Sequence, residues 1–124
     1  MPKTLILIVE DDRPVRETLV EALELDGYSV VAVENGRQAL QALGKRRPSA
    51  IVLDLMMPTM DGWEFRRLQR EIHGEIPVLV VSATANPRLE EMHADAFLMK
   101  PFELEEFLVV LRGILRRNGG ELAS

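Results

Sequence analysis

Short apolar runs that stop abruptly at a polar residue restrict the fold of this chain more than any other feature. The runs are residues 5–9 before Glu10, residues 51–53 before Asp54, and residues 78–81 before Ser82. Successive apolar positions rich in Val and Ile are typical of strands buried on both faces of a parallel sheet. We expect two further strands at residues 29–33 and 96–99, which are also mostly apolar.

Amphipathic helical patterns fill the intervals between the runs. The first begins after Asp12, whose side chain is a plausible helix cap, and stops before Gly27. The second lies between Asn35, another capping residue, and Gly44. The first helix has its apolar face at Val15, Leu19, Ala22 and Leu23, and the second has it at Ala39, Leu40 and Leu43. A third helix is indicated by Phe65, Leu68 and Ile72. A last helix is indicated by Leu104, Phe107, Leu108, Leu111 and Leu115.

The alternation of these segments predicts a (βα)5 arrangement, an α/β fold in which helices cover both faces of a five-stranded parallel sheet. A chain of 124 residues fits a single domain. We expect this domain to occupy residues 1–118. The segment 119–124, which contains two glycines, is expected to be a frayed end or the start of a linker.

Composition excludes several classes of protein. The chain has no cysteine, which rules out disulfides and thiolate metal sites, and its net charge is −5. Direct nucleic-acid binding is not expected, because it depends on clustered Lys and Arg. No apolar run approaches the ~18 residues of a membrane span, and the first run is too short for a signal peptide. We therefore expect a cytoplasmic protein that does not contact a membrane.

Polar side chains collect where the predicted strands end. Open parallel sheets bind ligands beyond the carboxyl ends of their strands, at the point where strand order reverses. Those ends carry Glu10 and Asp11, then Asp54, Ser82 and Lys100. If the first and third strands are neighbours, the carboxylates meet and repel one another unless a cation lies among them. Mg²⁺ suits such a site, because it takes a few carboxylates and keeps several waters.

The same residues suit phosphoryl transfer onto a carboxylate. Lys100 supplies a mobile ammonium group and Ser82 supplies a hydroxyl donor, so both can stabilise negative charge on a transferred phosphoryl group. Asp54 is then the nucleophile and the predicted phospho-acceptor. Such a domain would catalyse only its own phosphorylation and dephosphorylation, and would not be an enzyme in the usual sense.

Four segments resemble the receiver domains of bacterial two-component response regulators, of the chemotaxis-regulator kind. They are LILIVEDD, IVLDLMMPTMDGWEF, VVSATA and FLMKPF, which follow in the family's order over nearly the whole chain. The resemblance implies a flavodoxin-like sheet with strand order 2-1-3-4-5. It also implies that the phosphoryl group comes from a phosphohistidine on a sensor histidine kinase or phosphotransfer protein, and that a downstream protein or fused output domain receives the signal.

The resemblance also implies a set of metal ligands. Asp11 and Asp54 match the direct carboxylate ligands of the family's Mg²⁺ ion, and Glu10 matches an acid that acts through water. Met56 matches the position whose backbone carbonyl binds the ion.

Further matches concern the switch and the lysine. Ser82 and Phe97 match the two switch residues, although Phe97 replaces the commoner tyrosine and could equally be a core residue. Lys100 precedes Pro101, and the family's bond at this point is typically cis. Only 18 positions separate Ser82 from Lys100, about one helical turn (~4 residues) fewer than the resemblance implies. We therefore expect a shortened fourth helix within residues 87–93.

Several residues have a simpler structural interpretation. His73 and His93 lack a second ligand at metal-site spacing and are expected at the surface. Trp63 is expected to be partly buried near the acceptor loop. The basic groups at residues 45–47, at Arg66, Arg67 and Arg70, and at Arg112, Arg116 and Arg117 are expected on solvated faces. Surplus apolar surface on the last helix, which favours a partner or homodimer contact, is predicted at Val109, Val110 and Ile114.

Three hypotheses for function remain. The favoured one is a phosphorylation-dependent signalling switch. The second is a receiver that binds a partner constitutively, which only the shortened helix favours. The third is a magnesium-dependent phosphohydrolase, but the chain lacks a second Asp two residues after Asp54.

Overall fold

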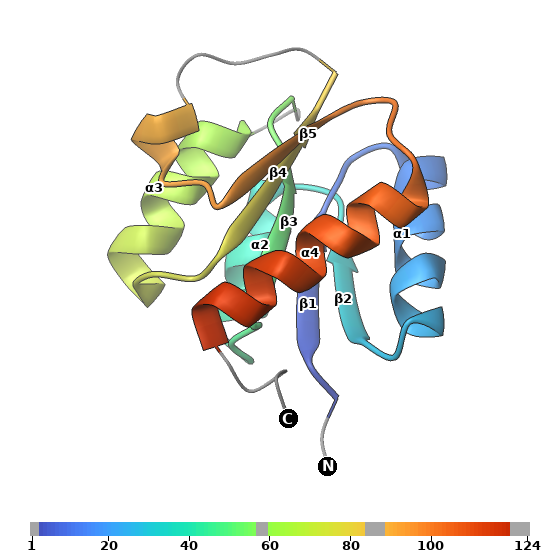
Figure 1. Cartoon of the computed structure of the whole chain (residues 1–124). Helices are drawn as coiled ribbons and strands as arrows, with labels where there is room; N and C mark the ends of the chain where they lie inside the picture. Colours follow the sequence, from blue (N-terminus) through green and yellow to red (C-terminus); the bar gives the residue numbers. More distant parts are fainter. Residues whose placement is uncertain (1–2, 57–59, 84–88, 120–124) are drawn as a thin grey trace.

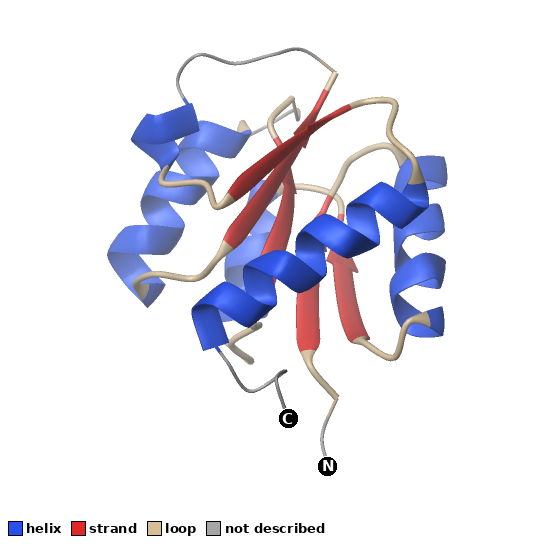
Figure 2. Cartoon of the chain, in the orientation of Figure 1, coloured by secondary structure: helices blue, strands red, loops and turns tan. Residues whose placement is uncertain are grey.

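Five parallel strands form one sheet in the order β2-β1-β3-β4-β5. The computed structural model describes residues 3–56, 60–83 and 89–119. Figure 1 traces the chain through these segments, and Figure 2 shows helices on both faces of the sheet. The predicted α/β class, doubly wound arrangement and strand order are confirmed.

The elements follow the predicted alternation closely. The strands are β1 (Leu5–Val9), β2 (Ser29–Val33), β3 (Ala50–Asp54), β4 (Val78–Ser82) and β5 (Ala96–Met99). The helices are α1 (Arg13–Leu25), α2 (Gly36–Leu43), α3 (Gly62–His73) and α4 (Leu104–Gly119), with the short 3-10 helix η1 (Leu89–Met92) between β4 and β5. Apart from Gly119, the expected tail at 119–124 lies outside the described residues.

Helix starts are fixed by short polar side chains. The Oδ1 atom of Asp12 accepts a hydrogen bond from the N–H of Val15 at 3.2 Å, which confirms the predicted cap of α1. Asn35 likewise accepts from the N–H of Gln38 at 2.9 Å at the start of α2. Such caps satisfy N–H groups that have no partner within the helix. Helix α1 therefore begins immediately after the acidic residues that follow β1.

The sheet has a separate apolar core on each face. Strand residues alternate between the faces, so Ile6 and Ile8 of β1 lie in one core while Leu7 and Val9 lie in the other. The first core is completed by α1 and α4, and the second by α2 and α3. This double burial explains why the strands are apolar at every position.

Helices α1 and α4, far apart in sequence, are also joined by an ion pair. Arg112 donates from Nε and Nη2 to the carboxylate of Asp26 at 3.1 to 3.2 Å. Figure 1 shows the two helices on the same side of the sheet. The prediction that Ile114 adds surplus apolar surface is wrong, because this residue is fully buried in the core beneath α4. Val110 packs at the edge of that core, and Val109 stays exposed.

The buried face of α3 differs from the prediction. Ile72 was expected in the apolar face, yet it is 62% exposed, while Arg66 and Gln69 are buried. The interpretation of Arg66 as a solvated residue is therefore wrong. Its guanidinium donates to the carbonyls of Ile76 (2.9 Å), Met92 (2.8 Å) and His93 (2.9 Å). A buried charge is tolerated here because hydrogen bonds replace its water.

The segment between β4 and β5 is short, as predicted. Among its described residues, η1 is the only helix and is a single 3-10 turn, while residues 84–88 lie outside the described part. Arg66 bonds to its last residue, Met92, and to His93 just beyond it. A side chain from α3 thus holds the end of this short segment.

Three other side chains complete the picture. His93 is exposed as expected, whereas His73 is half-buried. Trp63 is half-buried against the α2–α3 core, which agrees with its expected structural role. Among the described residues, no helix combines the length and the apolar character needed to cross a membrane.

Candidate functional site

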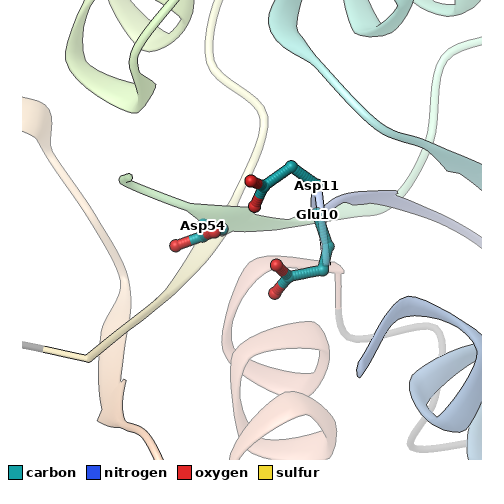
Figure 3. A group of neighbouring side chains, drawn as sticks. All are labelled: Glu10, Asp11 and Asp54. Atoms are coloured by element: carbon teal, nitrogen blue, oxygen red, sulfur yellow. The ribbon is translucent and has the colours of Figure 1, made fainter. Parts of the chain in front are cut away.

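Three carboxylates converge at the ends of β1 and β3. One ligand oxygen from each of Glu10, Asp11 and Asp54 lies within 4.8 Å of the others. Figure 3 shows the three side chains at the ends of these strands. Glu10 is 1% exposed and Asp54 is 4% exposed, whereas Asp11 is open to solvent. The predicted meeting of the acidic residues is therefore present in the fold.

Strand register brings these residues together. β1 and β3 are parallel neighbours with Val9 opposite Leu53, so the residues that follow, Glu10 and Asp54, emerge side by side. β1 also pairs with β2 on its other side, so strand β2 is added on one side of β1 and strands β3, β4 and β5 on the other. The strand order therefore reverses between β1 and β3. This is where open parallel sheets place their ligands.

Lys100 reaches the acidic residues from the loop that follows the edge strand β5. Its Nζ atom lies 2.8 Å from Oε1 of Glu10 and 3.7 Å from Oδ2 of Asp54. Its backbone N–H donates to the carbonyl of Ser82 at 2.7 Å, which fixes the loop after β5 against the end of β4. The Lys100–Pro101 peptide bond is cis, as predicted. One ammonium group thus faces two buried carboxylates.

The electrostatic balance of the site favours a further cation. Burial raises the pKa of Asp54 to about 7, and the nearby charge of Glu10 adds to the rise, against the lowering effects of Lys100 and of the Met56 N–H. Burial acts to lower the pKa of Lys100, but the hydrogen bond and charge of Glu10 outweigh it and the net direction is upward. Negative charge therefore exceeds positive charge among these groups.

The donor set fits a hard divalent ion. All three side-chain donors are carboxylate oxygens, the ligands that Mg²⁺ prefers, and exposed Asp11 leaves room for the waters that this ion keeps. Met56 follows within the same loop, where its N–H donates to Oδ1 of Asp54 at 3.2 Å. Residues 57–59 of this loop lie outside the described part of the chain.

The two predicted switch residues occupy different surroundings. Ser82 ends β4 and is buried beside the site, opposite Met99 in the β4–β5 register. Phe97 of β5 is half-buried and packs against the α2–α3 core. The contacts of Phe97 fit its interpretation as a packing residue, and the switch role of both residues stays a prediction.

Two residues near the site were missed by the sequence interpretation. Arg16 of α1 donates from Nη1 to the carbonyls of Glu10 at 2.8 Å and Asp11 at 3.4 Å. A Cβ atom at Gly62 would lie 2.8 Å from Cα of Leu55, so only glycine lets α3 start this close to the acceptor strand. The Asp–Gly pair at the start of α3 could have indicated the role of Gly62. The acceptors of Arg16 are backbone carbonyls, which leave no trace in a sequence.

Comparison with known proteins agrees with this geometry. Residues 6–112 match the family model for the response regulator receiver domain. Response regulator MprA of Mycolicibacterium vanbaalenii is 45% identical over 117 residues, which make up 91% of this chain and 51% of that protein. MprA of Mycobacterium avium is 43% identical over 120 residues, or 94% and 53% of the two chains. The chain thus spans about half the length of the curated relatives it matches.

Solved structures give the same result. The chemotaxis protein CheY4 of Vibrio cholerae superposes with a TM-score of 0.85 at 29% identity, covering 90% of this chain and 98% of the other. The receiver domain of a signal transduction histidine kinase from Syntrophus aciditrophicus has a TM-score of 0.84 at 33% identity, covering 94% and 92%. Both likenesses extend over almost the entire chain.

Proposed function

The chain belongs to the response regulator receiver domain family, and on that premise we propose that it is a Mg²⁺-dependent phospho-acceptor switch with Asp54 as the acceptor. The observation that carries the proposal is the cluster of three carboxylates within 4.8 Å, faced by Lys100. A sensor histidine kinase or a phosphotransfer protein would donate the phosphoryl group.

Asp11, Asp54 and the Met56 carbonyl would hold the ion, with Glu10 acting through a water molecule. The support is the hard-oxygen donor set and the excess negative charge among buried groups. When bound, Mg²⁺ supplies positive charge that offsets the charge of the phosphoryl oxygens. The ion would also lower the proton affinity of Asp54, because an adjacent cation favours the carboxylate form.

The chemical step then uses this chain's own side chains. An Asp54 carboxylate oxygen attacks the phosphorus of the donor phosphohistidine, forming the new oxygen–phosphorus bond as the phosphorus–nitrogen bond breaks. The imidazole leaves with the bonding electron pair and takes up a proton from water. Lys100, now 3.7 Å from Asp54, would move onto a phosphoryl oxygen, and the Ser82 hydroxyl would donate to another.

The signal would be a shift between two conformations. Ser82 would move toward the phosphoryl group and Phe97 would turn inward, which changes the affinity of the outer face for a downstream protein or a fused output domain. The receiver would occupy residues 1–118, act in the cytoplasm and bind neither nucleic acid nor a membrane directly. A homodimer is one candidate form of the activated state. The domain would catalyse only its own phosphorylation and dephosphorylation.

Intact mass after incubation with Mg²⁺ and acetyl phosphate tests the proposal. We expect a gain of one phosphoryl mass that is abolished by EDTA and by Asp54→Asn. Asp12→Asn is the matched control, since Asp12 caps α1 rather than facing the acceptor, and asparagine also caps helices.

The opposite result has a clear meaning. If the folded chain binds Mg²⁺ yet gains no mass from acetyl phosphate or from a panel of histidine kinases, the phospho-acceptor proposal fails. The constitutive binding module would then be favoured, with the short η1 segment as its distinguishing feature.

A further inference from the structure

Arg16 of α1 holds the backbone that carries the two acidic residues. Its Nη1 atom donates to the carbonyl of Glu10 at 2.8 Å and lies 3.4 Å from the carbonyl of Asp11. We propose that Arg16 is a positioning residue for the metal site, which fixes the Glu10–Asp11 turn and thereby sets the affinity for Mg²⁺. This inference rests on the proposed function, because it concerns the same site.

The turn needs such a restraint. Glu10 is anchored at its side chain by Lys100 at 2.8 Å and by the N–H of Asp12 at 3.2 Å, but Asp11 is exposed. An exposed aspartate on a free turn would lose backbone and side-chain freedom when it binds an ion. A guanidinium bound to both carbonyls removes part of that freedom in advance.

Arg16 is itself firmly placed. Its backbone N–H donates to the carbonyl of Asp12 at 2.9 Å in the first turn of α1. One turn further on, Leu19 is buried in the α1–α4 core, so the helix cannot shift without disturbing that core. The helix therefore transmits the rigidity of the core to the acidic turn through one side chain.

The positioning role and the charge of Arg16 predict opposite results, which makes the inference testable. A cation beside a Mg²⁺ site repels the ion, so loss of its charge alone would tighten Mg²⁺ binding. Loss of a group that orients metal ligands weakens binding, typically by about 10- to 100-fold. The sign of the change in affinity distinguishes the two.

The experiment is calorimetric titration of Mg²⁺ into the native chain and into Arg16→Gln, Arg16→Lys and Arg13→Gln. Arg13 is the matched control, because it lies on the same helix and pairs with exposed Glu17 at 2.9 Å. We expect Arg16→Gln to bind Mg²⁺ about tenfold more weakly than Arg13→Gln does. Arg16→Lys should fall between them, since a lysine can still donate to one carbonyl.

A second readout separates positioning from general damage. In phosphorylation by acetyl phosphate, Arg16→Gln should need about tenfold more Mg²⁺ to reach half its maximal rate, with a maximal rate close to that of Arg13→Gln. Thermal unfolding in EDTA confirms that each variant is folded. If Arg16→Gln fails to fold, the comparison of Arg16→Lys with Arg13→Gln decides in the same way.

The possible failures are distinct. If the native chain binds Mg²⁺ and Arg16→Gln binds it as tightly as Arg13→Gln or more tightly, the positioning role is overturned and the proposed function stands. If the native chain binds no Mg²⁺, the proposed function and the inference fall together.

Discussion

Within the described part of the chain, charge is buried in two places, and in opposite ways. At the strand ends, two nearly inaccessible carboxylates, Glu10 and Asp54, share one ammonium group from Lys100. Beneath α3, the guanidinium of Arg66 is also almost inaccessible, but it donates hydrogen bonds to three backbone carbonyls and to Oε1 of Gln69, and the exposed carboxylate of Glu75 lies 3.5 Å from it. The carboxylates therefore carry more negative charge than the one ammonium group offsets, whereas the guanidinium of Arg66 has acceptors for its hydrogen bonds.

The difference indicates different roles. Burial raises the pKa of Asp54 to about 7, which is the mark of a group whose charged form lacks sufficient compensation. Burial also lowers the pKa of Arg66, yet arginine stays charged because its ordinary value is so high. The carboxylates are therefore available to a cation, whereas the hydrogen bonds of Arg66 connect α3 to the loop before β4 and to the end of η1.

The largest expected effect concerns the pH dependence of stability without metal. The pKa of Asp54 is raised on folding, so its contribution to stability is greatest below about pH 4 and is lost as the pH rises through about 7. Asp54→Asn does not titrate. We expect the variant to be more stable than the native chain in EDTA at neutral pH, with a difference that grows from pH 5 to 8, up to a few kcal/mol.

Urea unfolding of both proteins in EDTA across this pH range measures the difference. A stability difference that stays constant with pH would contradict the account of the unbalanced carboxylates. Addition of Mg²⁺ should reverse the order and make the native chain the more stable of the two, because the ion binds only the folded state.

Removing Arg66 should also be costly. Arg66→Met keeps the side-chain length but leaves the buried carbonyls of Ile76 and Met92 without their donor. We expect a loss of about 3 kcal/mol in the free energy of unfolding. Arg67→Met is the matched control, because Arg67 is exposed and pairs with Glu71 on the helix surface, and it should change stability by less than about 0.5 kcal/mol.

A smaller effect is expected at the carboxylate pair. Glu10→Gln removes the charge that faces Asp54, so the pKa of Asp54 should fall from its raised value in the metal-free protein. Carbon-detected NMR titration of the aspartate carboxyl groups measures this. An unchanged pKa would mean that burial alone causes the rise, since burial is its larger source.

The smallest effect is expected at Glu75. Its carboxylate lies 3.5 Å from Nη2 of Arg66 but is largely exposed, and Arg70 also binds it. Exposed ion pairs contribute little, so Glu75→Gln should lower the free energy of unfolding by less than about 1 kcal/mol. A loss as large as that of Arg66→Met would show that the carboxylate, and not the carbonyls, compensates the buried charge.

The sequence was informative where a repeating pattern decided the structure. The strand ends follow from the apolar runs, and the cap at Asp12 follows from the capping preference of aspartate. The meeting of Asp11 with Asp54 was predicted from the strand order that the family resemblance implies. The shortened segment before β5 was predicted by comparing the number of positions between Ser82 and Lys100 with the number that the family resemblance implies.

The pattern failed where tertiary partners decided the outcome. Helical spacing placed Ile72 in the core and left Arg66 in solvent, yet the short η1 segment supplies carbonyls that favour an arginine in that position. Ile114 was assigned to the surface because helical spacing does not show how wide a face of α4 is buried. That width depends on how closely α1 approaches α4. Arg16 was missed because its acceptors are backbone atoms.

The pairing of α1 with α4 has a consequence for how the chain is made. Synthesis proceeds from the N-terminus, so α2 and α3 are available to cover their face of the sheet before β5 exists. Leu19 and Leu23 of α1 share their core with Phe107 and Leu111, which lie in α4 and are synthesised after all five strands. Until then, one face of a nearly finished sheet stays open, and a nascent chain halted before Leu104 would present that apolar surface to chaperones or to other nascent chains.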